Sequence, residues 1–172
     1  MPRNGDAAGM RAGLAAHLGS RQVARVVYGS IIGLALVVAL ESHPPGPGVV
    51  VGWLLGTAVS VALAEVYSDV VGTETRTRHR VTVHQVGPMV EDAAAVAFGI
   101  GFPALFFLLS LLGVASLDLA FELARWTGLA LIGFYGFWAA RFAGAPPHRA
   151  LLHALLVALV GGALIALEAL LH

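Results

Sequence analysis

The sequence of 172 residues contains no cysteine and has few charged residues, 12% in all. The absence of cysteine excludes disulfide bonds, thiolate metal ligands and thiol catalysis. Soluble domains carry about 25% charged residues. The low charge, the 58% hydrophobic content and the mean hydropathy of +0.84 therefore predict an integral membrane protein embedded in a lipid bilayer. The formal net charge of zero indicates no nucleic-acid partner.

Lysine and the motifs of soluble enzymes are also missing. We find no glycine-rich phosphate loop, no nucleophile elbow and no His-Glu-x-x-His helix, and we therefore predict that the protein is not an enzyme. All ten basic residues are arginine. Together with abundant alanine, glycine and valine, this composition is typical of GC-rich bacterial coding. We expect a multi-pass protein of the bacterial inner membrane.

Five apolar stretches are long enough to cross a bilayer, which takes about 20 helical residues. We predict spans at about 23–40, 49–71, 90–113, 117–142 and 149–170. Clusters of glycine and proline lie between several of them. The sequence thus predicts an all-α membrane protein with a cytosolic tail or surface helix over residues 1–22. Residues 23–172 form one membrane domain, with a short cytosolic loop over 72–88.

The fourth stretch has three charged residues in its first third, Asp118, Glu122 and Arg125. Their spacing of four and three places them on one helix face, because residues three or four apart are neighbours on a helix surface. We expect these three charges to neutralise one another.

The arginines indicate the orientation of the spans. Nine of the ten precede the first span, lie between the second and third, or flank the link between the fourth and fifth: Arg3, Arg11, Arg21, Arg25, Arg76, Arg78, Arg80, Arg141 and Arg149. Cytoplasmic segments of membrane proteins are enriched in basic residues. We therefore predict that the N-terminus lies inside and the C-terminus outside.

The second span has a small residue at every fourth position. The stripe consists of Gly48, Gly52, Gly56, Ser60, Ala64, Ser68 and Gly72, and Gly29 and Gly33 form a shorter pair in the first span. Small residues let helix backbones approach closely in lipid. The stripe predicts either packing against another span of the same chain or a homodimer contact.

Carboxylates lie at the inner ends of the second and third spans. Glu65 and Asp69 are one turn apart, and Glu91 and Asp92 begin the third span. All four could converge to ligate a hard divalent cation. In the simpler interpretation, Glu91 and Asp92 stabilise a helix N-terminus and Asp69 reaches the headgroups. Glu65 lies deepest, where a carboxylate costs about 2.5–3.5 kcal/mol, so we predict that it is protonated or held by a cation.

Several segments carry a resemblance to a known family. They are "VYGSIIG" at 27–33, "TAVSVALAEVYS" at 57–68, the spacing of Phe98, Gly99, Gly101 and Pro103, and the link "WAARFAGAPPHRALLHAL". In these segments the chain resembles the vacuolar iron transporter family of five-span membrane proteins. The resemblance implies a dimeric fold, with its N-terminus inside and polar residues at the centre of the dimer.

The chain also departs from that family. The Asn-Asp pair of the family's first span falls on Ile31 and Ile32, and the methionine of its second span falls on Val61. The family's long carboxylate-rich cytosolic domain corresponds here to a short segment whose one acidic residue is Glu74. The resemblance therefore does not carry over a complete iron site.

Three functions follow as alternatives. The leading one is transport of a divalent cation, iron or manganese, coupled to protons through Glu65, with Ser60 and Asp69 as further ion-binding residues. A divalent metal ion is the one possible cofactor. The alternative is a non-transporting membrane scaffold, or a small subunit of a larger membrane complex, that has lost the family's metal site. The third is an ion channel lined by the polar rows of the second span.

Overall fold

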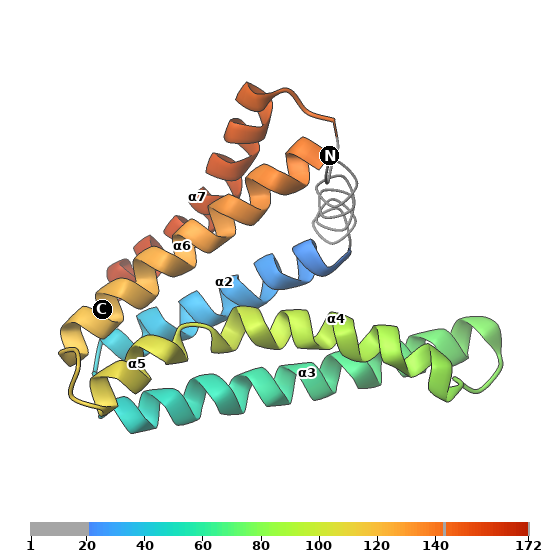
Figure 1. Ribbon diagram of the computed structural model, residues 1–172, viewed down its shortest axis with the longest axis horizontal. Coiled ribbons are helices and arrows are strands. Elements are labelled where there is room, and N and C mark those ends of the chain that lie inside the picture. The colour runs from blue at the N-terminus through green and yellow to red at the C-terminus, as the bar shows by residue number, and fades with distance from the viewer. Residues whose placement is uncertain (1–20, 143, 172) are drawn as a thin grey trace, which may run out of the picture.

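The computed structural model describes residues 21–142 and 144–171, and these residues form helices and turns with no strand among them (Figure 1). The helices are α2 (Arg21–Glu41), α3 (Pro47–Thr77), α4 (Val83–Gly101), α5 (Ala104–Leu111), α6 (Leu117–Phe142) and α7 (Pro147–Leu171). The all-α prediction is confirmed. Residues 1–20 lie outside the described residues, so the N-terminal tail stays a prediction.

Two of the described helices, α2 and α3, are long and apolar enough to cross a membrane. Helices α4 and α5 are also long and apolar enough when they are taken together as one bent span. Within the described residues, α6 and α7 do not meet it. The helices are therefore compatible with a membrane protein of two or three spans, and the five-span topology stays a prediction.

The predicted third span is not one straight helix. Helix α4 begins at Val83, and a bend of 48° separates it from α5. Pro103 lies at the break. A proline has no N–H to donate to the carbonyl four residues earlier, and its ring clashes with that carbonyl. Phe102 still donates to the Phe98 carbonyl at 2.8 Å, so α4 remains regular up to the residue before the proline.

The predicted loop over 72–88 is largely helical. Helix α3 continues to Thr77 and α4 begins at Val83, which leaves only residues 78–82 outside both helices. The hydroxyl of Thr75 donates to the Val71 carbonyl at 2.7 Å, so a polar side chain here bonds to the helix itself. Thr82 and Gln85 form a capping box that begins α4. The two long helices thus make an extended hairpin.

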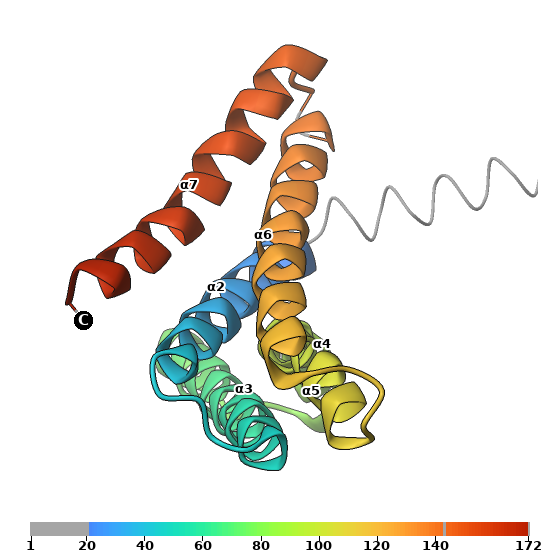
Figure 2. The same ribbon diagram turned by 90° about the vertical axis from the view of Figure 1, so that its left-hand side faces the viewer.

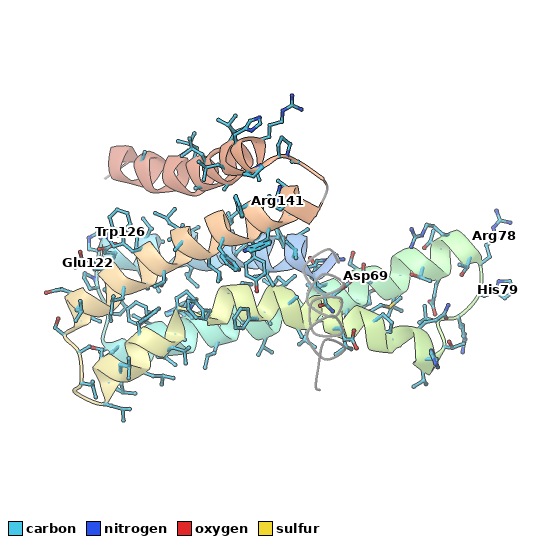
Figure 3. The ribbon with its side chains drawn as sticks, turned by 45° about the horizontal axis from the view of Figure 1, so that its top comes forward. Asp69, Arg78, His79, Glu122, Trp126 and Arg141 are labelled. Atoms are coloured by element: carbon cyan, nitrogen blue, oxygen red, sulfur yellow. The ribbon has the colours of Figure 1, made fainter. Side chains whose placement is uncertain are left out.

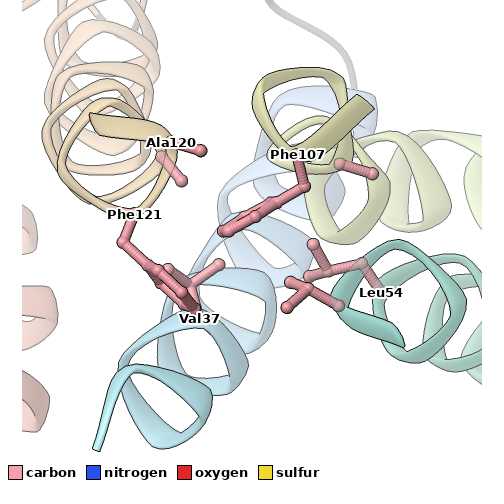
Figure 4. Packing of buried hydrophobic residues seen from close by; sticks show 8 residues of the cluster. Val37, Leu54, Phe107, Ala120 and Phe121 are labelled. Atoms are coloured by element: carbon pink, nitrogen blue, oxygen red, sulfur yellow. The ribbon is translucent and has the colours of Figure 1, made fainter. Parts of the chain in front are cut away.

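Helix α2 lies at the centre of the described fold. It packs mainly against α4 and α6, whereas α3 packs against α4 and α5, and α7 packs on α6 (Figures 1 and 2). Figure 4 shows side chains from α2, α3, α5 and α6 converging on one buried cluster. The cluster consists of Val37, Val50, Leu54, Ala104, Phe107, Ala120, Phe121 and Ala124.

The crossing of α2 and α4 depends on glycine. A Cβ atom at Gly29 would overlap the Val96 carbonyl, and one at Gly33 would lie 2.9 Å from the Ile100 carbonyl oxygen. Gly99 is equally close to the backbone of α2. The shorter of the two small-residue patterns therefore brings two backbones into contact within the chain.

The longer stripe on α3 does not pack within the chain. A Cβ atom at Gly52 or Gly56 would meet nothing within 4 Å, and one at Gly48 would meet only the Leu111 side chain at 3.7 Å. Of the two alternatives predicted for this stripe, packing against another span of the same chain is not seen among the described residues at Gly52 and Gly56. Helix α3 instead turns Leu54 and Ala58 toward its neighbours, and the small residues face outward.

Candidate functional site

An ionic cluster joins the beginning of α2 to α3. The guanidinium of Arg25 forms one ion pair with the Glu65 carboxylate and a second, at 3.4 Å, with an oxygen of Asp69. Glu65 and Asp69 lie one turn apart and therefore share a face of α3. The three side chains are partly buried, with exposed fractions of 25% for Arg25, 20% for Glu65 and 32% for Asp69. Figure 3 labels Asp69 within the α3–α4 hairpin.

Arg25 provides a cation for the deepest carboxylate. We predicted that Glu65 is protonated or held by a cation, and the guanidinium of Arg25 holds it. In the sequence, Arg25 was assigned only to the group of arginines that indicate the orientation of the spans. The partners are 40 residues apart, and no local spacing rule connects positions on two different helices.

The four predicted metal ligands do not share one site. Asp92 of α4 is partly buried and forms no ion pair among the described residues, whereas Glu91 is exposed. Neighbouring residues of a helix point about 100° apart, so both cannot face Arg25. Within residues 21–142 and 144–171, no three His, Asp or Glu side chains lie close enough together to hold a metal ion. The cluster that does form is Arg25 with Glu65 and Asp69.

Ser60 lies on a different face of α3 from Glu65. Five residues at about 100° each place the two side chains about 140° apart around the helix. Ser60 is exposed and lines a shallow groove of about 620 Å³ that opens away from the chain. The rest of the lining is Val49, Gly52, Trp53, Gly56 and Thr57. The predicted ion-binding set of Ser60, Glu65 and Asp69 is therefore divided between two surfaces.

A second groove runs between α3 and α4, with a volume of about 870 Å³. Its lining is almost wholly apolar, and Leu55, Val59, Leu63, Val90 and Phe98 are among the residues that form it. An apolar surface of this kind suits lipid chains. It offers no row of polar groups that leads toward the ionic cluster.

A further ion pair joins the other end of α2 to α6. The Nη1 atom of Arg125 donates to both carboxylate oxygens of Glu41, each at 3.1 Å. We expected Arg125 to pair with Asp118 and Glu122 on its own helix, and that expectation is wrong because Arg125 turns toward α2. Asp118 and Glu122 are exposed. The structure thus fixes α2 ionically at both ends.

Comparisons of the chain with protein-family models, with curated proteins and with solved structures find no match. The resemblance to the vacuolar iron transporter family stays a prediction from the sequence.

Proposed function

We propose that the protein is a non-transporting membrane scaffold, or a small subunit of a larger membrane complex, that assembles as a homodimer through the outer face of α3. One observation carries the proposal. The groove that contains Gly52, Gly56 and Ser60 faces away from the chain, while Glu65 lies on another face of the same helix and is already paired with Arg25. One face of α3 thus contacts other helices of the fold, and the face with Gly52, Gly56 and Ser60 is exposed.

The ionic cluster fits a structural role. A lone carboxylate in hydrocarbon is costly, and pairing with a guanidinium offsets part of that cost. Helices α2 and α3 share few other contacts. Arg25 therefore links two helices that otherwise meet mainly through α4, and it uses Glu65 and Asp69 to do so.

The outer groove of α3 fits a second helix. Between helices in lipid there is little hydrophobic attraction, so association depends on close van der Waals packing at small residues. No atom of the described residues would lie within 4 Å of a Cβ at Gly52 or Gly56, which leaves room for a partner backbone. A copy of α3 offers the same small residues in return, so the contact is self-complementary.

The membrane arrangement belongs to the same proposal. We infer five spans in a bacterial inner membrane, with the N-terminus inside and the C-terminus outside. Arg76, Arg78 and Arg80 near the turn between α3 and α4, and Arg141 and Arg149 around the link between α6 and α7, support this orientation. The resemblance to the vacuolar iron transporter family supports the dimer.

Divalent-cation transport is the second candidate. Two carboxylates, Glu65 and Asp69, pair with one arginine, so the cluster has an excess of negative charge. Such an excess favours binding of a cation such as iron(II) or manganese(II) or of a proton. In this candidate, the metal ion has to displace Arg25 from Glu65.

Flux through proteoliposomes distinguishes the two candidates. Purified chain is reconstituted around a metal-sensitive dye, with and without a pH gradient, and uptake of manganese(II) and iron(II) is compared with empty liposomes. The scaffold proposal predicts no uptake above empty liposomes for the wild type. Uptake by the wild type that Glu65→Gln abolishes and Glu122→Gln preserves would reject it in favour of transport.

A further inference from the structure

The turn between α3 and α4 is held in one conformation from both sides. The N–H of Arg78 donates to the Glu74 carbonyl at 2.8 Å, and the N–H of Val81 donates to the Glu74 carboxylate at 3.0 Å. On the other side, the N–H of Thr82 donates to the Gln85 side chain at 2.9 Å. These bonds hold residues 78–82, the turn itself, in one conformation. We use the name hairpin tip for this turn together with its flanking residues, 76–84.

The hairpin tip is basic. Arg76, Arg78 and Arg80 are exposed, and in the described part of the chain none of them forms an ion pair. The nearest acidic residue, Glu74, uses its carboxylate on the backbone of the turn. Figure 3 shows Arg78 and His79 at the far end of the hairpin, well beyond Asp69. Three exposed arginines thus lie close together in the sequence and outnumber the one acidic residue beside them, Glu74.

An apolar side chain is displayed beside these arginines. Val83 is 91% exposed at the start of α4. Basic residues combined with an exposed apolar residue are typical of surfaces that lie at the boundary between lipid headgroups and acyl chains. A soluble anion would use the arginines and leave Val83 in water, whereas a lipid surface accommodates both.

The length of α3 brings the tip to such a boundary. Its 31 residues span about 46 Å at 1.5 Å per residue, and a bilayer with its headgroups is about 40–45 Å thick. With Pro47 in one headgroup layer, the hairpin tip therefore lies at the opposite headgroup layer. The ordinary tilt of membrane helices keeps it there.

We propose that the hairpin tip is a binding site for the headgroups of anionic phospholipids, whose phosphates pair with Arg76, Arg78 and Arg80. Guanidinium groups bind phosphate through paired hydrogen bonds. The inference requires α3 to cross the membrane but shares no residue with the proposed dimer groove. Its test is therefore independent of the test of the scaffold proposal. The orientation of the protein in the membrane determines only which leaflet supplies the lipid.

The test measures lipid affinity of the full-length chain in detergent. Fluorescent phosphatidylglycerol and phosphatidylcholine are each titrated into the wild type, the tip variant R76Q/R78N/R80Q and the control variant R3Q/R11Q/R149Q, which removes the same charge elsewhere. Asparagine replaces Arg78 because the backbone φ of Arg78 is 57°, a value that asparagine tolerates better than most residues. We expect the tip variant to lose roughly 100-fold in affinity for phosphatidylglycerol, about five-fold for each arginine.

Each outcome bears on the proposal. Loss of phosphatidylglycerol binding in the tip variant but not in the control supports it. Equal affinity of the wild type for the two lipids, or equal losses in the two variants, would overturn it, and so would displacement of the lipid by millimolar inorganic phosphate. If the tip variant does not fold, the wild type decides the question. Its affinity for phosphatidylglycerol, but not phosphatidylcholine, must fall between about 50 mM and about 500 mM NaCl.

Discussion

Arg25 of α2 and Glu65 of α3 form an ion pair between two helices whose direct contact is otherwise small. Asp69, one turn along α3, accepts a second contact from the same guanidinium. A carboxylate that the sequence marks as a candidate for ion transport is thus part of an internal link. The consequences for stability and for function can be measured separately.

The link between Arg25 and Glu65 predicts a coupling energy. In a double-mutant cycle of Arg25→Gln and Glu65→Gln, we expect the two changes to couple by about 1–2 kcal/mol, because either change alone breaks the same partly buried ion pair. Arg25→Gln should be the more destabilising of the two, since Arg25 has two partners. Thermal unfolding in detergent, followed by circular dichroism, measures both effects. Strictly additive changes would mean that the pair contributes no stability.

Two glycine patterns should respond differently to substitution. Gly29→Ala should destabilise the fold by about 1–3 kcal/mol, because its Cβ overlaps the Val96 carbonyl. Gly52→Ala should leave the stability of the protomer unchanged, because its Cβ meets no atom. Thermal unfolding of the two matched variants gives the comparison. Equal destabilisation by both would show that α3 packs within the chain through its small residues.

The contribution of Arg125 to stability should come from its ion pair with Glu41 and not from the acidic residues of its own helix. Glu41→Gln is expected to cost about 1 kcal/mol, since the side chain loses two charge-assisted contacts to Arg125. Glu122→Gln removes an exposed carboxylate from α6 and serves as the control with an effect close to zero. The unfolding midpoint of each variant in detergent reports the difference. A larger loss of stability in Glu122→Gln than in Glu41→Gln would instead support an ion pair within α6.

The five-span orientation predicts the location of three reporter fusions. Fusions after Gly46 and at His172 should report the extracytoplasmic side, and a fusion near Arg78 should report the cytoplasm. Two reporters are used in parallel. Alkaline phosphatase is active on the extracytoplasmic side and the fluorescent protein is fluorescent in the cytoplasm, so each location gives a positive signal from one of them. If His172 and Arg78 both report the cytoplasm, the segment between them crosses an even number of times and the five-span arrangement is wrong.

The helices could be predicted from the sequence because their signals are local. Apolar runs, prolines and glycines located the ends of α2 and α6 to within about two residues. Helix α3 runs past its predicted end, and in this extension the hydroxyls of Thr75 and Thr77 donate to carbonyls one turn back along the helix. The bend between α4 and α5 was not predicted, because the third span was expected to run unbroken over 90–113.

The candidate site could not be predicted, because its contacts join separate helices. The spacing of Glu65 and Asp69 showed that they share a face, but not that the face turns to Arg25. The longer glycine stripe was the more conspicuous pattern. It is nevertheless the short pair, Gly29 and Gly33, that packs within the chain. Which helix meets which is a property of the whole bundle.

Disulfide cross-linking at Ser60 tests the central proposal, that the outer face of α3 joins two copies, most directly. The chain has no cysteine, so Ser60→Cys introduces a single thiol in the groove, and Leu155→Cys places one on an exposed position of α7. A disulfide forms only when the two Cα atoms approach within about 7 Å. We predict that mild oxidation of membranes yields a covalent dimer for Ser60→Cys, but not for Leu155→Cys, and that adding Gly52→Leu abolishes it. A Ser60→Cys protein that stays monomeric, or that cross-links no better than Leu155→Cys, would contradict the account.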